Sequence, residues 1–274
     1  MDRLPAIFVS HGAPTLALED SATARFLRAL GRALPRPRGI LAVSAHWLTT
    51  QPAVSAAAQP ETIHDFGGFG PELEAIEYRA PGAPALAARA QELLAAAGLA
   101  TAVAVRGLDH GAWVPLLHMF PDADVPVTQL AVQPRRDPAH HYALGRALAP
   151  LCDDGWLVLG SGGISHNLPE FMRRGGAGPT PAWVKAFTGW FAQHLADGAI
   201  EDALAYRERA PGPALNHPTD EHLLPLFVAL GAGGLPARRV HEAVDHAVIA
   251  LDAYVFGGGA ASLKDILEAA AQTA

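Results

Sequence analysis

The stretch Ala6-Ile-Phe-Val-Ser-His-Gly-Ala-Pro-Thr15, near the start of a chain of 274 residues, decides the fold. Its apolar run, followed by serine and histidine, predicts a buried strand that ends at His11. The same pattern returns in Ile40-Leu-Ala-Val-Ser-Ala-His46. Open α/β sheets bind ligands at the carboxyl ends of their strands, so the repetition predicts that His11 and His46 form a pair. Taken alone, either histidine is also explained as an ordinary hydrogen-bonded residue at a strand-to-loop junction.

Composition narrows the class of protein. The apolar runs are broken well before the roughly 18 residues that a membrane helix needs, and no secretory signal precedes the first strand. The formal net charge is -7 with lysine and arginine scattered, which argues against a nucleic-acid partner. Cys152 is the single cysteine, so we expect no disulfide framework, and a small buried thiol in a cytoplasmic protein. The sequence does not separate a monomer from a homodimer.

Helical and strand-like segments alternate along the chain, which is typical of an α/β fold. Ser21 is expected to cap the first helix, and His140 and His141 are expected on the surface of a later one. The expected helices are at 21–34, 84–97, 138–151, 181–195, 200–207 and 262–271, and the strands after the first are at 39–45, 53–58, 101–105, 125–132, 156–160, 238–244 and 248–256.

Three more histidines fall at strand ends or helix starts. Asp109-His110-Gly111 follows a strand and opens a helix, which places His110 at the same level as His11 and His46, and His166 follows a strand after a glycine-rich turn. The alternative for the first motif is that Asp109 caps the helix and His110 is a turn residue. His222 is expected, beside Glu221, in the first turn of another helix. Structural histidines have no reason to share this placement, whereas a metal centre has one, because imidazole binds Zn, Fe, Cu and Ni.

Some of these motifs allow other interpretations. The turn Ser161-Gly-Gly-Ile-Ser-His166 could cradle a phosphate or present Ser161 as a nucleophile, but it matches neither the P-loop nor the G-x-S-x-G pattern. Its glycines more simply let the backbone pass close to a ligand. The loop at 62–70 could line a substrate site or be a turn held by Asp65. His241 and His246 stay open as members of the site.

A series of motifs runs in order over nearly the whole chain. They are Ser10-His11-Gly-Ala-Pro-Thr15, Ser44-Ala-His46-Trp47, Asp65-Phe66 with Gly68-Phe69, Tyr78 with Ala80-Pro81-Gly82, Gly107-Leu-Asp-His-Gly-Ala-Trp-Val-Pro-Leu116, Gly160-Ser-Gly-Gly-Ile-Ser-His-Asn-Leu168, His217-Pro, Glu221-His222-Leu-Leu-Pro-Leu226 and Asp252-Ala-Tyr-Val-Phe-Gly257. This set resembles the DODA-type extradiol ring-cleavage dioxygenases, relatives of the class III LigB enzymes.

The resemblance implies a fold and a site. The fold would be one α/β domain over residues 1–274, with a central mixed sheet flanked by helices as in LigB-like proteins. One divalent metal ion per chain, Fe(II) for dioxygenase activity or Zn(II), would be held by His11, His46 and His222, with Glu221 as a rival ligand. The catalytic residues would be His110 and His166, and the substrate would be bound by His64, Asp65, Phe66, Trp47, Trp113 and Tyr254.

The resemblance also implies a reaction, in which dioxygen is inserted into a catechol-type ring, DOPA-like or another ortho-diphenol, to give a ring-opened semialdehyde. We expect His166, near its ordinary pKa, to remove a proton from the diol, and His110 to stabilise the bound oxygen by hydrogen bonding. One departure is His64, where the family loop often has tyrosine. A zinc-dependent hydrolase using the same three histidines, and a non-catalytic binding protein without metal, are the rival interpretations.

Overall fold

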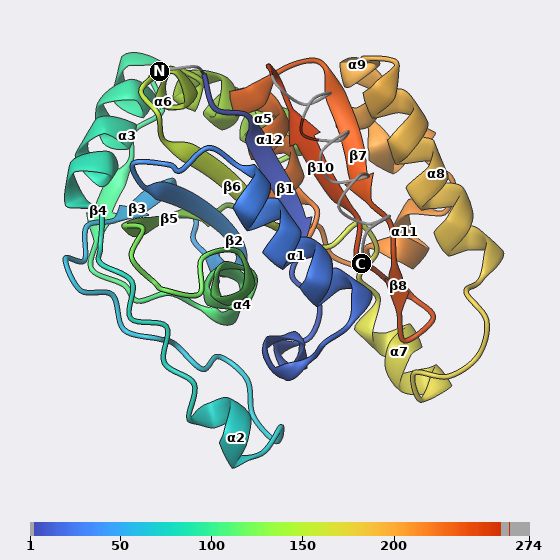
Figure 1. Cartoon of the computed structure of the whole chain (residues 1–274). Helices are drawn as coiled ribbons and strands as arrows, with labels where there is room; N and C mark the ends of the chain where they lie inside the picture. Colours follow the sequence, from blue (N-terminus) through green and yellow to red (C-terminus); the bar gives the residue numbers. More distant parts are fainter. Residues whose placement is uncertain (1–2, 259–262, 264–274) are drawn as a thin grey trace.

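An eight-stranded mixed sheet runs through the computed structural model, which describes residues 3–258 and Leu263 (Figure 1). Its strands are β1 (Ala6–Ser10), β2 (Ile40–Leu48), β3 (Ala53–Ser55), β4 (Ala102–Ala104), β5 (Val127–Val132), β6 (Leu157–Gly162), β7 (Ala237–His241) and β10 (Ala253–Phe256). The order across the sheet is β4-β3-β5-β2-β6-β1-β10-β7. β5, β2, β6 and β1 are parallel neighbours, and antiparallel pairs flank them. The expected α/β fold with a mixed sheet is therefore confirmed.

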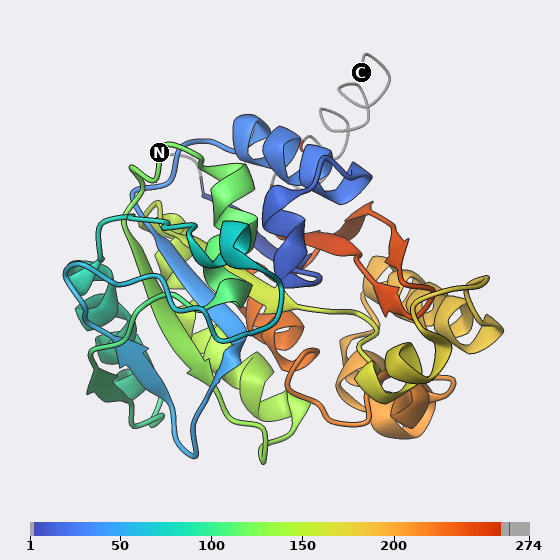
Figure 2. The same ribbon diagram turned by 90° about the horizontal axis from the view of Figure 1, so that it is seen from below.

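Helices cover both faces of the sheet (Figures 1 and 2). α1 and α4 pack on one face, and α5 and α12 pack together on the other. The helical elements are η1 (Pro14–Leu18), α1 (Ala22–Ala33), α2 (Pro71–Glu74), α3 (Pro84–Ala96), α4 (His110–Met119), α5 (Pro138–Leu148), α6 (Pro150–Asp153), α7 (Leu168–Arg174), α8 (Ala182–Ala196), α9 (Ile200–Leu204), α10 (Tyr206–Arg209), α11 (Pro213–Asn216) and α12 (Leu224–Gly233). No helix in the described part of the chain has the length and apolar character to cross a membrane.

The strand β1 shows why the sheet is buried on both sides. Successive side chains of a strand point to opposite faces, and the apolar run at 6–9 therefore serves two cores. Ile7 and Val9 pack with α1 and α4, whereas Phe8 packs with the core around α5 and α12. With both faces covered, the carboxyl ends of the parallel strands remain as the place where polar side chains can gather.

Two predicted helix caps are confirmed. The Ser21 hydroxyl accepts a hydrogen bond from Ala24 N at 3.3 Å, and α1 begins at the next residue. The Asp109 carboxylate accepts one from Ala112 N, also at 3.3 Å, so α4 begins at His110. A side-chain oxygen at this position satisfies an amide that has no partner within the helix. The second cap matters for the site because it places His110 at the start of α4.

The prediction that Glu221 and His222 lie in the first turn of a helix was wrong. Both lie in a turn, and α12 begins only at Leu224. The reason is Pro225, which fits the start of a helix because its missing N–H has no intrahelical partner there. A helix that began at Glu221 would place this proline in its interior, where it would remove a hydrogen bond and clash with the preceding turn.

The prediction of a surface position for His141 was also wrong, because its side chain is fully buried. His141 lies on the same face of α5 as Leu144 and Leu148, three and seven residues further on, and this face packs against the core. His140 is half-buried. The ring of His141 is satisfied on both sides, since Nδ1 donates to Asp137 O and Nε2 accepts from Gln133 N.

The end of the chain differs from the sequence prediction in its strand boundaries. The two long strands expected at 238–244 and 248–256 are divided into β7, a small hairpin of β8 (Val244–Asp245) and β9 (Ile249–Ala250), and β10. His246 and Ala247, with φ of 48° and 65°, form the tight turn of that hairpin. The helix expected at 262–271 lies outside the described residues except for Leu263.

Candidate metal centre

β1 and β2 lie on either side of β6, and this arrangement brings His11 and His46 together. His11 follows the last residue of β1, and its amide donates to Gly162 O at the end of β6. The two imidazole Nε2 atoms are 3.0 Å apart. The pairing of His11 and His46 expected from the repeated strand pattern is thus observed.

His222 reaches the same place because Gly162, the last residue of β6, has no side chain that would keep its backbone away. Gly163 N donates to His222 O at 2.9 Å, and a Cβ added to Gly162 would lie 2.0 Å from that oxygen. The glycines of this turn therefore admit the backbone of the segment before α12, rather than a ligand as the sequence suggested. The His222 ring centroid lies 5.4 Å from that of His11 and 5.0 Å from that of His46.

Each of these three rings has an oxygen partner at Nδ1. The Ser161 hydroxyl lies within hydrogen-bond distance of His11 at 3.0 Å and the Glu221 carboxylate of His222 at 3.2 Å, and the Asp65 carboxylate faces His46 at the ion-pair distance of 3.4 Å. A neutral imidazole carries one N–H, so a donating Nδ1 leaves Nε2 with a lone pair. This second contact is the usual way in which proteins orient a metal-binding histidine.

Burial keeps the three rings neutral. It is the main cause that lowers the pKa of His11 and of His222 well below the ordinary range, and the neighbouring histidines add to it. Burial likewise lowers the pKa of His46 to about 3, with His110 contributing and Asp65 opposing. Neutral imidazole is the form that binds metal.

The residues fit a divalent ion. The Nε2 atoms of His11 and His46 would otherwise bring two lone pairs to 3.0 Å, and Nε2 of His222 is buried without a hydrogen-bond partner. One ligand atom from each histidine can be chosen so that all lie within 4.8 Å of one another. Two nitrogens bound to one ion at about 2.0–2.1 Å lie roughly 3 Å apart, so the observed pair needs little rearrangement. The Glu221 carboxylate accepts from His222 Nδ1, a contact that fits a partner of the ligand, and Glu221 also forms a group with His166 and His222 that could hold an ion.

His110 and Asp65 adjoin these three rings. Asp65 Oδ1 accepts from both N and Nδ1 of His110, at 3.0 and 2.9 Å, while Oδ2 faces His46. Partial burial acts to raise the pKa of Asp65, but the hydrogen bonds and charges of His110 and His46 hold it at about 2. Asp65 is therefore an ionised bridge between two rings whose centroids are 3.9 Å apart.

His166 stacks on His222, with centroids 3.5 Å apart and an angle of 8° between the planes. Its amide donates to Asn216 O at 2.9 Å, which fixes the end of the glycine-rich turn. We expected its pKa near the ordinary value, and this was wrong. Burial lowers the pKa of His166 to about 4, although the charge of Glu221 opposes this, so the ring is neutral at neutral pH.

The six predicted substrate residues fall into two groups. Asp65 and Phe66 adjoin the centre, the Phe66 ring lying 5.7 Å from that of His110, and His64 packs behind Phe66 with Nε2 hydrogen-bonded to Ile76 O. The other three are enclosed by the fold, although the Trp113 ring still lies 6.2 Å from that of Phe66 and 5.9 Å from that of His64. Trp47 packs against Ala53 and Ala131, Trp113 is fully buried and donates to Ile63 O, and Tyr254 is fully buried in the core beside Phe256. Tyr254 and Trp113 thus expose no surface to a ligand in this structure.

Two other histidines that the sequence left open are located away from the centre. His241 stacks on Phe26, and His246 contacts Phe171 in the turn of the hairpin. Two serines contact the centre in roles that the sequence did not indicate. The Ser44 hydroxyl accepts from His46 N and donates to Asp109, and Ser161 contacts His11. The available signal for Ser44 was the serine that comes one or two residues before each of the strand-end histidines, His11 and His46.

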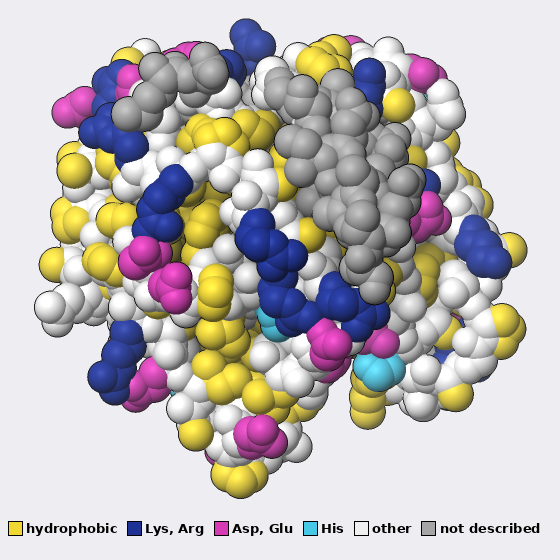
Figure 3. All heavy atoms as spheres, viewed as in Figure 1, with side chains coloured by type: hydrophobic (Ala, Val, Ile, Leu, Met, Phe, Trp, Pro, Cys, Tyr) yellow, Lys and Arg dark blue, Asp and Glu magenta, His cyan; other side chains and the backbone are white. Residues whose placement is uncertain are grey.

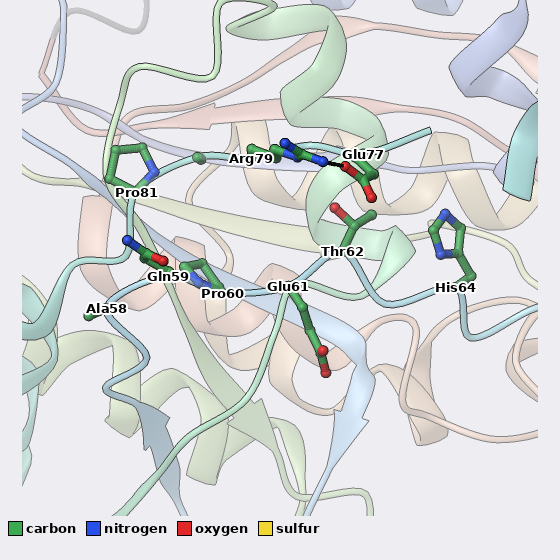
Figure 4. Close-up of a pocket in the computed structure, with 10 residues that line it drawn as sticks. Ala58, Gln59, Pro60, Glu61, Thr62, His64, Glu77, Arg79 and Pro81 are labelled. Atoms are coloured by element: carbon green, nitrogen blue, oxygen red, sulfur yellow. Dashed lines mark hydrogen bonds and ion pairs between the residues drawn. The ribbon is translucent and has the colours of Figure 1, made fainter. Parts of the chain in front are cut away.

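A surface groove of about 750 Å³ lies between the segments 58–64 and 77–81 (Figure 4). Of the predicted site residues only His64 is among its lining, and an ion pair between Arg79 and Glu77 spans its edge. The groove is therefore separate from the histidine cluster.

Basic and acidic side chains are interspersed on the face shown in Figure 3. Many of the charges on the molecule are paired; for example, Arg25 and Arg28 both form ion pairs with Asp20.

Comparison with known proteins agrees with this site. A family described as the catalytic LigB subunit of aromatic ring-opening dioxygenase matches residues 5–257. A protein of Beta vulgaris named 4,5-DOPA dioxygenase extradiol is 42% identical, over 91% of this chain and 95% of its own. An Escherichia coli protein of the same name is also 42% identical, over 84% and 85%.

A solved structure is similar as well. The crystal structure of the uncharacterized protein JW3007 from Escherichia coli K12 superposes with a TM-score of 0.78 and 35% identity, over 93% of this chain and all of that one. The family match spans every strand of the sheet and all five clustered histidines. The chain thus belongs to the LigB family of aromatic ring-opening dioxygenases, and it is a metal-dependent extradiol ring-cleavage dioxygenase.

Proposed function

We propose that this enzyme cleaves a DOPA-like catechol or a related ortho-diphenol with dioxygen, using one Fe(II) per chain held by Nε2 of His11, His46 and His222. The observation that carries the proposal is the convergence of three neutral imidazoles, each with a different oxygen partner at Nδ1. The names of the relatives in Beta vulgaris and Escherichia coli support a DOPA-like substrate. The product would be a ring-opened semialdehyde.

Bound Fe(II) would supply open positions for the two diol oxygens and for dioxygen. It would also supply the redox chemistry that lets a spin-paired diol react with dioxygen. The protein supplies the proton transfers. His166 is neutral at neutral pH, and a neutral imidazole has a nitrogen that can accept a proton from a diol hydroxyl. Burial, which lowers its pKa to about 4, makes it a weaker base than free imidazole. Its stacking on His222 places it beside the ligand set.

His110 is held in one orientation by two hydrogen bonds to Asp65. Because Nδ1 donates to the carboxylate, Nε2 is the atom that His110 presents to the reactants, and we propose that it forms a hydrogen bond with the reacting oxygen. The edge of Phe66 beside His110 offers an apolar contact for an aromatic ring. These positions support the proposal that His166 is the proton acceptor and His110 the residue that orients oxygen.

An oxygen-electrode assay tests the function. Metal-free enzyme is loaded anaerobically with Fe(II) and supplied with DOPA, gallate or protocatechuate, with zinc-loaded and metal-free enzyme as controls. The expected result is stoichiometric oxygen uptake with at least one diol, dependent on Fe(II) and reduced by about 10²–10⁴-fold in His166→Ala. Hydrolysis of esters or amides by the zinc-loaded form, with no oxygen uptake in the iron-loaded form, would support the zinc hydrolase instead.

We also propose a cytoplasmic location. The single cysteine, Cys152, is buried, and burial raises its pKa to about 11, so the thiol is protonated and unreactive. A protein whose Fe(II) centre depends on neutral imidazoles and that uses no disulfide suits a reducing compartment. Cell fractionation followed by immunodetection checks this, and recovery in a secreted fraction would contradict it.

A further inference from the structure

Ser161 is a residue that the proposed reaction does not use. It lies in β6, its side chain is fully buried, and its hydroxyl has two neighbours from different parts of the chain. One is Nδ1 of His11 at 3.0 Å, and the other is the carbonyl oxygen of Gly111 in α4 at 2.5 Å. A buried polar group needs hydrogen-bond partners, and one partner of this serine is a candidate metal ligand. The serine therefore has a role beyond packing.

The direction of both hydrogen bonds follows from the number of protons. A carbonyl oxygen only accepts, so the single hydroxyl proton of Ser161 must be donated to Gly111 O. The hydroxyl oxygen can then only accept from His11, and Nδ1 of His11 must carry the proton. The three groups form a chain of hydrogen bonds that runs from His11 Nδ1–H through the serine hydroxyl to the carbonyl. If the serine donated to His11 instead, the carbonyl oxygen would lose this donor.

We propose that Ser161 is a positioning residue that holds His11 as the Nδ1–H tautomer and thereby directs its Nε2 lone pair at the metal. This inference rests on the metal centre proposed above. Without the serine acceptor, the other tautomer would place a proton on Nε2, which faces Nε2 of His46 at 3.0 Å. That proton would have to be displaced before an ion could bind.

The other two ligands show why the role falls to Ser161. His46 faces the Asp65 carboxylate and His222 donates to the Glu221 carboxylate, and both carboxylates belong to segments outside the sheet. His11 is fully enclosed between β6 and α4, where an ionised acceptor would be costly to bury, and a hydroxyl that is itself hydrogen-bonded meets the same need at lower cost. The same burial excludes the nucleophile interpretation, because the hydroxyl has no exposed surface and no free proton direction.

The experiment compares Ser161→Ala with Ser165→Ala. Both serines are fully buried and both hydroxyls donate to a backbone carbonyl, Ser165 to Val248 O, but only Ser161 contacts a ligand. Zn(II) affinity is measured by competition with a chromogenic chelator, and the His11 tautomer by ¹⁵N NMR of histidine-labelled, metal-free protein, with His11→Gln used to assign the signal. Denaturant titrations record the stability of both variants.

The expected result is a Zn(II) Kd weakened by about 10–100-fold in Ser161→Ala and unchanged in Ser165→Ala. The wild-type His11 signal should show the proton on Nδ1, and Ser161→Ala should shift it towards a mixture. A wild-type His11 protonated on Nε2, or equal Kd values in wild type and Ser161→Ala, would overturn the role of Ser161. Failure of the wild type itself to bind an ion would instead overturn the metal centre, and the NMR result would still decide the tautomer.

Discussion

Gly111 is the position at which the smallest change should have the largest effect on the centre. A Cβ added there would lie 2.3 Å from the Ser44 hydroxyl, 3.0 Å from His46 Cδ2 and 3.2 Å from His11 Cε1. The hydroxyl cannot move away freely, because it donates to Asp109 at 2.6 Å and accepts from His46 N. Gly111→Ala should therefore displace a ligand ring or break the Ser44–Asp109 bond.

The cost can be worked out from these contacts. Loss of a buried hydrogen bond to a carboxylate costs about 1.5–3 kcal/mol, and overpacking adds about 1–3 kcal/mol. Replacing a helical glycine with alanine returns at most about 1 kcal/mol. The net expectation for Gly111→Ala is a loss of roughly 1.5–5 kcal/mol in the free energy of unfolding, together with a Zn(II) Kd weakened by about 10–100-fold.

Gly189→Ala is the matched control for this substitution. Gly189 is exposed in α8, and an added Cβ there meets nothing within 4 Å. The control should gain up to about 1 kcal/mol from helix propensity alone. Urea titrations of both metal-free variants, and chelator competition with Zn(II), provide the two readouts. If Gly111→Ala is as stable as Gly189→Ala and binds Zn(II) as the wild type does, the close approach of α4 to the ligands is not what holds the centre.

Three further predictions concern charge and metal. Burial lowers the pKa of His141 to about 4 from the ordinary 6.5, so the folded protein binds fewer protons than the unfolded chain between these values and loses stability as the pH falls. Urea titrations from pH 7 to 4 should show the wild type losing up to about 1.4 kcal/mol per pH unit more than His141→Gln, and parallel curves would contradict this. Glu221→Gln keeps an oxygen acceptor for His222 and should weaken Zn(II) less than Glu221→Ala, for which about 10–100-fold is expected; a loss as complete as in His222→Ala would make Glu221 a ligand. Zn(II) at 100 times its Kd should raise the unfolding free energy of the wild type by about 2.7 kcal/mol and leave His222→Ala unchanged, as measured by thermal unfolding with and without a chelator.

The sequence predicted which histidines meet because strand ends are visible in a linear pattern. An apolar run that stops at serine and histidine marks the carboxyl edge of a parallel sheet, and two strands with the same ending on either side of one strand, here β6, can bring their histidines together above it. The cap at Asp109 was visible for a similar local reason, and it located His110. Such predictions need only the period of a strand and the chemistry of a helix start.

The partners of the histidines could not be predicted in the same way. Ser161, Asp65 and Glu221 differ in residue type and in distance along the chain from the ring that each holds, and no periodicity links them. Asp65 was predicted to bind substrate because it lies in a glycine-rich loop, yet the structure shows it bridging His46 and His110. The pKa of His166 was missed for a different reason, since burial depends on the packing of several segments and not on the residues beside it in the sequence.

The same partners change the charge that a substrate would meet. Three neutral imidazoles alone would leave a divalent ion with its full charge, and that charge would strongly attract an anionic diolate. Asp65 is ionised and faces His46, and the Glu221 carboxylate accepts from His222, so two carboxyl groups lie close to the centre. A dianionic diolate would then meet a nearly compensated site, whereas a diol that keeps one proton would not add a second excess charge. If His166, stacked on His222, takes the remaining proton during the reaction as proposed above, the carboxylates and His166 together would favour a monoanionic bound substrate.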